Sequence, residues 1–289
     1  MKITAAVSRS PDSRFTLESV DLDEPRPDEV LVRISATGLC HTDLSSKSRM
    51  PGPAVLGHEG AGVVEAVGAQ VAGIAPGDHV LLSYRSCGEC AHCRGGHRSY
   101  CSRSALLNSS GGRADGTATL SQNGIRLFGS FFGQSSFAQY ALAVTVVDPV
   151  ASRRAKAVEL GASQIVDPSS EDVAAAVQGA THALDTTGLG HVLAAALSAL
   201  ESRGILAVVG LGARHVTIDI TDLLLNGKMI RGCIEGDANP TEFIPKLLTL
   251  HAQGKFPMDA IVRRYDARDI ETAVADSRSG EAIKPVLVW

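Results

Sequence analysis

The chain has 289 residues and a formal net charge of −4, with 27 Lys and Arg against 31 Asp and Glu. This balance argues against nucleic acid or an anionic membrane as a partner, because such binding needs a surplus of positive charge. The length exceeds what a single small core organises, so we expect two domains. The sequence contains no run of about eighteen apolar residues and opens without a signal peptide, which predicts a cytoplasmic protein.

The first part of the chain predicts a β-rich domain. In the run 29–36, apolar Val30, Val32 and Ile34 occupy every second position, the pattern of a strand with one buried face. Further strands are expected at 3–7, 14–20, 62–67 and 79–82. Turn residues separate these runs, so we predict a partly antiparallel, barrel-like domain whose loops carry potential metal ligands.

From residue 144 onward the chain changes character. Valine-rich strands alternate with alanine-rich helical stretches, which is typical of βαβ units around a parallel sheet. The expected strands are 144–147, 163–167, 181–185, 204–210 and 228–235, followed by a last strand at 285–289. The expected helices are 152–160, 171–178, 190–201, 241–253 and 269–277. The fold class is therefore α/β with an additional β-rich domain.

Four cysteines predict a closed metal site. Their spacing is C-x2-C-x2-C-x7-C, formed by Cys87, Cys90, Cys93 and Cys101. One short loop with this spacing wraps a tetrahedral Zn²⁺, and four thiolates leave no position for water, so the site is structural. The alternatives are unconnected free thiols or a redox pair, and a reducing compartment disfavours disulfides. His92 and His97 lie within the loop and are expected to be spectators.

A second set of residues predicts an open metal site. Cys40 and His58 are candidate ligands, and Glu59 is a carboxylate able to ligate the metal or to tune it. Catalytic zinc takes three protein ligands and keeps a fourth position for a substrate oxygen. Thr42 is then placed to pass a proton from a metal-bound substrate oxygen, and Asp43 to orient His58. A lone histidine is more often simply packed or exposed, but His58 stands between glycines and a carboxylate.

Several motifs together resemble the zinc-dependent medium-chain alcohol dehydrogenases, with the aryl (benzyl) alcohol dehydrogenases nearest. Besides the four-cysteine loop they are Gly-Leu-Cys-His-Thr-Asp at 38–43, Gly-His-Glu-x-x-Gly at 57–62, and the segments 131–140, 185–188 and 276–285. The resemblance implies a GroES-like catalytic domain at 1–143, a Rossmann-like domain at 144–284, and a final strand at 285–289 that returns to the first domain.

The same resemblance implies an NAD-dependent oxidation of a primary, aromatic alcohol to an aldehyde. Cys40 and His58 would ligate the catalytic zinc, and His41 and Lys284 would lie near the cofactor pyrophosphate. Asp148 would accept hydrogen bonds from the adenosine ribose and favour NAD over NADP. The expected partners are a small alcohol or aldehyde and further copies of the chain in a homodimer or homotetramer.

The sequence departs from this family in one place. The segment with the third catalytic zinc ligand and the first Rossmann strand with its G-x-G-x-x-G turn are absent, and the flanking parts join near Ala143 and Val144. The runs 188–193 and 210–215 do not replace that turn, because the last position of each, Leu193 and His215, is not the glycine that G-x-G-x-x-G requires there. Cys233, the remaining cysteine, is expected to be a packing residue and not a replacement ligand.

The missing first strand belongs at the centre of a Rossmann sheet. Its loss predicts an incomplete sheet whose facing strand edges are unpaired, and it also removes a helix N-terminus that binds pyrophosphate. Three hypotheses follow: an NAD-dependent zinc alcohol dehydrogenase, a non-catalytic zinc-binding remnant of that family, or a sequence from which residues are missing. The third would separate the Cα atoms of residues 143 and 144 by more than about 3.8 Å.

Overall fold

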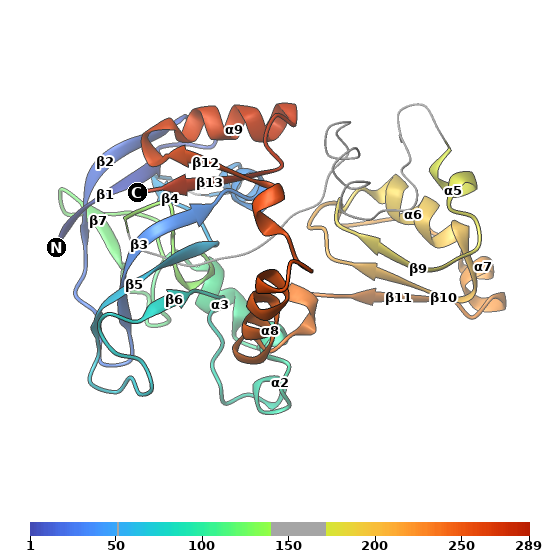
Figure 1. Cartoon of the computed structure of the whole chain (residues 1–289), viewed down its shortest axis with the longest axis horizontal. Helices are drawn as coiled ribbons and strands as arrows, with labels where there is room; N and C mark the ends of the chain where they lie inside the picture. Colours follow the sequence, from blue (N-terminus) through green and yellow to red (C-terminus); the bar gives the residue numbers. More distant parts are fainter. Residues whose placement is uncertain (51, 140–171) are drawn as a thin grey trace. The chain divides into compact units, whose positions relative to one another are not determined.

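The computed structural model describes residues 1–50, 52–139 and 172–289 (Figure 1). The described residues form two compact units, one containing 1–139 and 239–289 and the other 172–238. The expected boundary at 284 therefore differs from the observed grouping, in which the whole stretch from 239 joins the first unit. The expected strands 144–147 and 163–167, the helix 152–160, Asp148 and the junction at 143 and 144 lie outside the described residues.

The first unit contains two five-stranded sheets. The first has the order β4 (Ala54–Val55), β1 (Lys2–Ser8), β2 (Phe15–Leu22), β7 (Leu120–Gln122) and β8 (Ile125–Arg126). The second has the order β12 (Val262–Asp266), β13 (Lys284–Val288), β3 (Val30–Gly38), β5 (Gly60–Val67) and β6 (His79–Leu81). The β-rich first domain predicted from the sequence is confirmed, and most of its strand pairs are antiparallel.

The C-terminal part of the chain completes the second sheet. Strand β13 runs antiparallel to β3, with Val286 opposite Gly38, and β12 pairs with β13 in parallel. Helix α9 (Ile270–Ser279) lies against β13 and buries Ile270 and Val274 (Figure 1). This pairing returns Lys284, at the start of β13, to the unit that holds the cysteine motifs.

The core of the first unit is apolar and well filled. Val7, Leu56, Phe131 and Phe137 are each at most 2% exposed. Phe137 also meets the ring of Phe15 edge-on, with centroids 5.5 Å apart, a favoured aromatic geometry. The core lies beside the turn that carries His58, so its packing fixes the backbone of the candidate site.

A buried arginine ties the loops at the base of this unit together. Arg113, whose side chain is 5% exposed, donates from Nε and Nη2 to the two carboxylate oxygens of Glu29, at 2.8 and 2.9 Å, and from Nη1 to Asp23. Burial alone raises the pKa of Glu29, but the guanidinium outweighs it and the net pKa is lowered. The pKa of Asp23 is lowered as well, chiefly by its hydrogen bond from Arg113.

We expect Arg113→Met to destabilise the protein by about 3 kcal/mol, because it leaves a desolvated carboxylate without its partner. Arg26→Met, which removes the exposed ion pair with Asp115, is the control and should cost at most about 1 kcal/mol. Because the folded-state pKa values of Glu29 and Asp23 are depressed, this stabilisation is present above the ordinary carboxyl pKa values and is lost as the pH falls below them. Urea unfolding at pH 7 and pH 3 measures both effects, and equal costs for the two variants at pH 7 would contradict the assignment.

The second unit is a parallel sheet with helices. Its order is β11 (Met229–Gly232), β10 (Leu200–Val208) and β9 (Ala180–Asp185), and its helices are α5 (Val173–Ala176), α6 (Gly190–Ala199) and α7 (Ile220–Leu225). Both strand pairs are parallel. Leu193 and Leu197 of α6 pack with Leu206 of β10 in a small core. The fold is thus α/β, with three parallel strands of a Rossmann-type sheet among the described residues of this unit.

Two predicted elements of this half are shorter than expected. The strand expected at 228–235 ends at Gly232, because Glu235, Gly236 and Asp237 adopt positive φ angles of 51°, 71° and 54°. The helix expected at 171–178 covers only Val173–Ala176. Helix α8 (Pro240–Ala252), expected at 241–253, belongs to the first unit. Within the described ranges, no helix has the length and apolar character that crossing a membrane requires.

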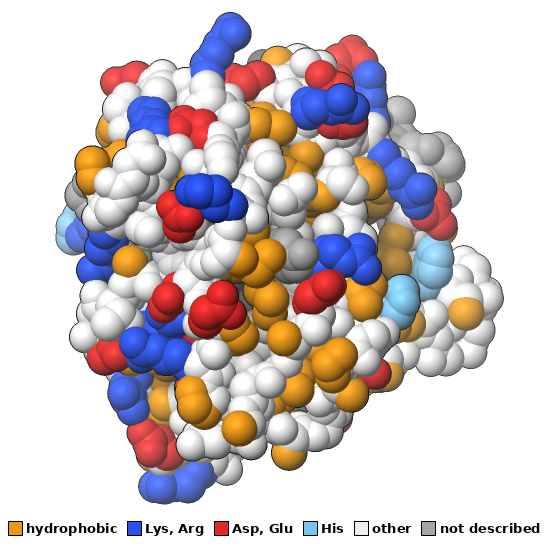
Figure 2. All heavy atoms as spheres, turned by 90° about the vertical axis from the view of Figure 1, so that its left-hand side faces the viewer, with side chains coloured by type: hydrophobic (Ala, Val, Ile, Leu, Met, Phe, Trp, Pro, Cys, Tyr) orange, Lys and Arg blue, Asp and Glu red, His pale blue; other side chains and the backbone are white. Residues whose placement is uncertain are grey.

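The charges on the visible face of the molecule are mixed. Figure 2 shows Lys and Arg interspersed with Asp and Glu on that face, and no part of it is uniformly basic. This distribution agrees with the small net charge of −4. The face in view therefore lacks the continuous positive stripe that a nucleic-acid backbone needs.

Candidate metal centres

The four cysteines of the loop come together as predicted. Cys90 caps helix α2 (Ala91–Arg94), and Cys93 lies within that helix. The four Sγ atoms all lie within 4.8 Å of one another, and those of Cys87 and Cys93 are 3.9 Å apart. Zinc–sulfur bonds of about 2.3 Å in a tetrahedron separate sulfurs by about 3.8 Å. The cluster therefore fits Zn²⁺ with four thiolate ligands.

Backbone N–H groups point at these sulfurs. The amide of Cys90 donates to Cys87 Sγ at 3.4 Å, and that of Cys87 to Cys101 Sγ at 3.3 Å. Backbone donation from Cys93 and Ser102 lowers the pKa of Cys90 to about 5. Burial acts in the other direction on Cys93 and raises its pKa to about 11. The loop thus already favours thiolate at part of the set, which is the form that binds metal.

The other residues of this loop do not join the cluster. His92 and His97 are exposed and lie outside the group of four sulfurs, in line with their expected spectator role. Every cysteine in the described part of the chain is a free thiol. Cys233 lies just past β11 in the second unit, where its amide donates to the carbonyl of Val208 at 2.9 Å. It is not part of either cluster.

The second predicted site is also assembled. Cys40 is the N-cap of helix α1 (His41–Lys47), in an extended conformation, and the amide of Thr42 donates to its Sγ at 3.5 Å. His58 and Glu59 lie in the turn before β5. A donor atom from each of Cys40, His58 and Glu59 lies within 4.8 Å of the other two. The group offers one sulfur, one nitrogen and one oxygen, a donor set suited to zinc.

Asp43 fixes the geometry of this group. Its side chain is fully buried, and Oδ2 accepts from the amide of Cys40 at 3.0 Å. Oδ1 accepts from the amide of Gly57 at 3.0 Å and lies 2.9 Å from Nδ1 of His58. A carboxylate can only accept, so the Nδ1 proton of His58 points at Asp43 and Nε2 is left for a metal. The role expected for Asp43 agrees with this arrangement.

Neighbouring groups shift the pKa of His58. Burial lowers the pKa of the imidazole, but the Asp43 carboxylate and the Cys40 thiol raise it more, so the net pKa is well above its usual range. A metal ion at this position would displace the proton, because ligation requires the neutral ring.

The surroundings of the Glu59 carboxylate indicate whether a metal ion fits this site. Its side chain is 2% exposed, Oε2 contacts the ammonium of Lys284, and Oε1 is buried without a hydrogen-bond partner among the described residues. A carboxylate oxygen in that state is costly. A metal ion held with Cys40 and His58 would satisfy it, so these residues fit a three-ligand zinc site.

The remaining predicted residues differ in their burial and in their contacts with this cluster. Thr42 is half-buried beside Cys40, whereas His41 is exposed at the first position of α1. Lys284, expected near a cofactor phosphate, has its ammonium on Glu59. Asp148 is outside the described residues.

Two aromatic rings and a glutamine contact His58, and the sequence did not predict these contacts. The ring of Phe132 stacks on His58 at 4.8 Å and 26°, and Phe131 meets it edge-on at 5.7 Å. Gln134 Nε2 donates to the carbonyl of His58 at 3.1 Å. Phe132 has a φ of 52°, which is unusual for a bulky residue. The motif at 131–140 was the available signal, but it did not indicate a function for each residue.

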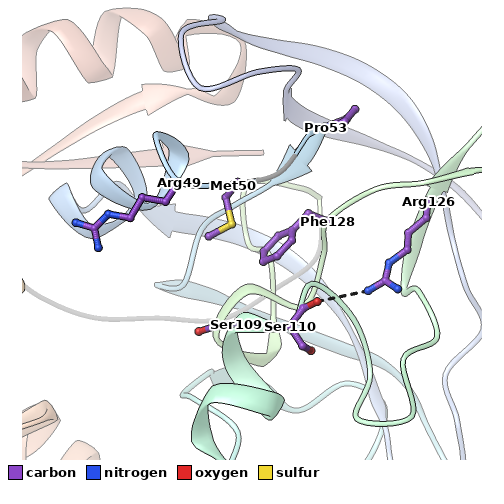
Figure 3. A pocket seen from close by; sticks show the side chains of 7 residues that line it. All are labelled: Arg49, Met50, Pro53, Ser109, Ser110, Arg126 and Phe128. Atoms are coloured by element: carbon purple, nitrogen blue, oxygen red, sulfur yellow. Dashed lines mark hydrogen bonds between the residues drawn. The ribbon is translucent and has the colours of Figure 1, made fainter.

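A cavity of about 570 Å³ lies beyond helix α1, lined by Arg49, Met50, Pro53, Ser109, Ser110, Arg126 and Phe128. In Figure 3 Met50 and Phe128 lie side by side, Arg49 points away from them, and Arg126 reaches the Ser110 carbonyl. Arg126 also donates to the carbonyls of Gly111 and Gly116. None of Cys40, His58 and Glu59 lines this cavity, so we do not place the chemistry there.

The glycine-rich runs of the second unit serve packing. The loops after β9 and β10 cross so closely that a Cβ on Gly212 would lie 2.2 Å from the carbonyl oxygen of Gly188. Buried Asp185 closes the first loop by accepting from the amides of Thr187 and Gly188. These contacts explain the glycines without a phosphate, consistent with the expectation that the two runs are not cofactor turns.

Comparisons with known proteins give two matching family models and several similar proteins. The family model described as "Alcohol dehydrogenase GroES-like domain" matches residues 26–147, and the model described as "Zinc-binding dehydrogenase" matches 128–252. A geraniol dehydrogenase of Castellaniella defragrans is 38% identical over 99% of this chain and 97% of its own length. That alignment has 362 positions against 289 residues here, so at least 73 positions have no counterpart in this chain.

Two solved structures have the same fold. An alcohol dehydrogenase zinc-binding domain protein from Burkholderia ambifaria is 40% identical, with a TM-score of 0.92 over 100% of this chain and 99% of the other. The benzyl alcohol dehydrogenase from Acinetobacter calcoaceticus is 34% identical, with the same TM-score and coverage.

Proposed function

Because this chain belongs to the zinc-dependent medium-chain alcohol dehydrogenases, we propose that it oxidises primary alcohols to aldehydes with NAD as the hydride acceptor. The observation that carries this proposal is the meeting of Cys40, His58 and Glu59, with a buried oxygen of Glu59 left without a partner. The sequence suggested that the third zinc ligand is missing, and Glu59 supplies a third donor.

The names of two relatives indicate the class of alcohol. Geraniol and benzyl alcohol both carry their CH2OH group on an unsaturated carbon, so the aldehyde formed is conjugated. We therefore propose aromatic and allylic primary alcohols as substrates. In this reaction the carbinol carbon loses a hydride to NAD, and the hydroxyl loses a proton.

Each residue of the cluster has a role in that reaction. Bound zinc would polarise the alcohol oxygen and make its proton easier to lose. Cys40, His58 and Glu59 would hold the metal, and Asp43 keeps the imidazole proton on Nδ1. Thr42, two positions after Cys40, would relay the hydroxyl proton, accepting it while its own hydroxyl proton passes on to water. The expected contacts of His41 and Asp148 with NAD, the homo-oligomer and the cytoplasmic location stay predictions.

A second candidate function has a specific observation in its favour. At least 73 positions of the alignment with the geraniol dehydrogenase have no counterpart here, and the described second unit holds three parallel strands. A non-catalytic zinc protein would keep the four-cysteine site and lose cofactor binding.

Metal content and NAD binding separate the two candidates. For the dehydrogenase we expect two zinc ions per chain, NAD binding by calorimetry, and NADH formation with benzyl alcohol. His58→Ala should lose one of the two metals and the NADH signal, whereas His92→Ala, in the exposed part of the loop, should change neither. One zinc per chain together with silent calorimetry would establish the non-catalytic protein instead.

A further inference from the structure

Lys284 lies against the second metal cluster, far in sequence from its other members. Its side chain is 11% exposed, and its ammonium contacts Oε2 of Glu59, 225 positions earlier in the chain. The pairing of Val286 with Gly38 brings the two strands together. The absence of a side chain at Gly38 provides the space for this contact, because a Cβ there would lie 2.0 Å from Glu59 Oε2 and 2.9 Å from Lys284 Cε. The contact is thus built into the fold.

The two oxygens of Glu59 have different surroundings. Oε2 is engaged by Lys284, whereas Oε1 is buried with no hydrogen-bond partner in the described part of the chain. A Glu59 oxygen lies within 4.8 Å of the donor atoms of both Cys40 and His58. Since Oε2 is already occupied, Oε1 is the oxygen that remains for a cation.

We propose that Lys284 is a positioning residue for the catalytic metal. By holding Oε2 it prevents the carboxylate from turning and presents Oε1 as the third donor beside Cys40 and His58. The inference rests on the proposed zinc site, and it assigns Lys284 a role other than the cofactor-phosphate contact that the resemblance implied. Groups that orient metal ligands in this way typically account for a 10–100-fold difference in metal affinity.

One opposing effect has to be weighed. The ammonium carries a positive charge and repels a divalent cation, so removing it would by itself strengthen metal binding. A buried carboxylate with two unpartnered oxygens, however, turns toward any other donor it can reach. The lost orientation of the carboxylate is expected to outweigh the lost repulsion of the cation, so removing Lys284 should weaken metal binding.

The test is a Co²⁺ titration of the metal-stripped full-length chain, followed by absorption. The four-cysteine site has four thiolate ligands and the second cluster one, so the two equivalents differ in the intensity of their sulfur-to-cobalt bands. In Lys284→Met we expect the second equivalent to bind about 10–100-fold more weakly and the first to be unchanged. Lys284→Arg should restore most of the affinity, since it keeps a donor for Oε2.

A double variant tests whether Lys284 affects metal binding through Glu59. In a Glu59→Gln background, Lys284→Met should cause no further loss, because the carboxylate it positions is gone. Unchanged or tighter binding of the second equivalent in Lys284→Met would overturn the inference, as would an equal weakening of both equivalents, which would mark a purely structural role. A wild-type chain that takes up only one Co²⁺ would instead overturn the zinc site on which the inference rests.

Discussion

Replacing Cys93 with serine is expected to remove one zinc per chain and to lower stability by several kcal/mol. Cys93 is 5% exposed and packs with Cys101 and Leu107 in a small cluster, so the hydroxyl would meet no water and bind metal poorly. Binding of structural Zn²⁺ contributes about 10–16 kcal/mol in small zinc peptides. A sizeable part of that free energy is lost when one of four thiolates is removed.

Zinc content and urea unfolding measure this result, and the chain offers a matched control. Cys233 is a cysteine outside both clusters, so Cys233→Ser should keep the full metal content and change stability by less than about 1 kcal/mol. A Cys93→Ser protein that retains all of its zinc and its urea midpoint would show that the loop does not depend on the metal.

The two metal clusters differ in how far the sequence predicts them. The four cysteines lie within 15 consecutive positions, so local spacing alone determines which atoms can meet, and the structure agrees with the prediction. Cys40 and His58 belong to separate turns, so the sequence offered them as candidate ligands without showing that they meet. The contact of Lys284 with Glu59 depends on the register between β13 and β3, and no local pattern encodes that register.

The fold shows the same division between local and long-range information. Alternating apolar positions predicted β3, whose one face is buried. Strand β12 was missed, because its sequence Val-Arg-Arg-Tyr-Asp has little apolar content and it lies at the edge of its sheet. The end of β11 depends on positive φ angles at Glu235 and Asp237, which are neither glycine nor asparagine. Such exceptions follow from tertiary packing more than from propensity.

Replacing Asp43 with asparagine is expected to weaken the second metal site about 10–100-fold and to cost about 1–3 kcal/mol of stability. The carboxylate accepts three hydrogen bonds, from His58 and from the amides of Cys40 and Gly57. Asparagine has one accepting oxygen, so its NH2 group must face one of these donors. If it faces His58, it also forces the proton onto Nε2, the nitrogen that the metal needs.

Asp78→Asn is the control for this substitution, because Asp78 accepts from the amide of Ala75 in an exposed turn and belongs to neither metal cluster. It should leave both Co²⁺ equivalents unchanged. The expected result for Asp43→Asn is a weaker second equivalent, a normal four-thiolate spectrum for the first, and a proportionate loss of NADH formation with benzyl alcohol. Since Asp43 would act on a bound metal only through His58 and Cys40, wild-type affinity in this variant would mean that packing by Phe132 and Gln134, and not the carboxylate, holds the imidazole in place.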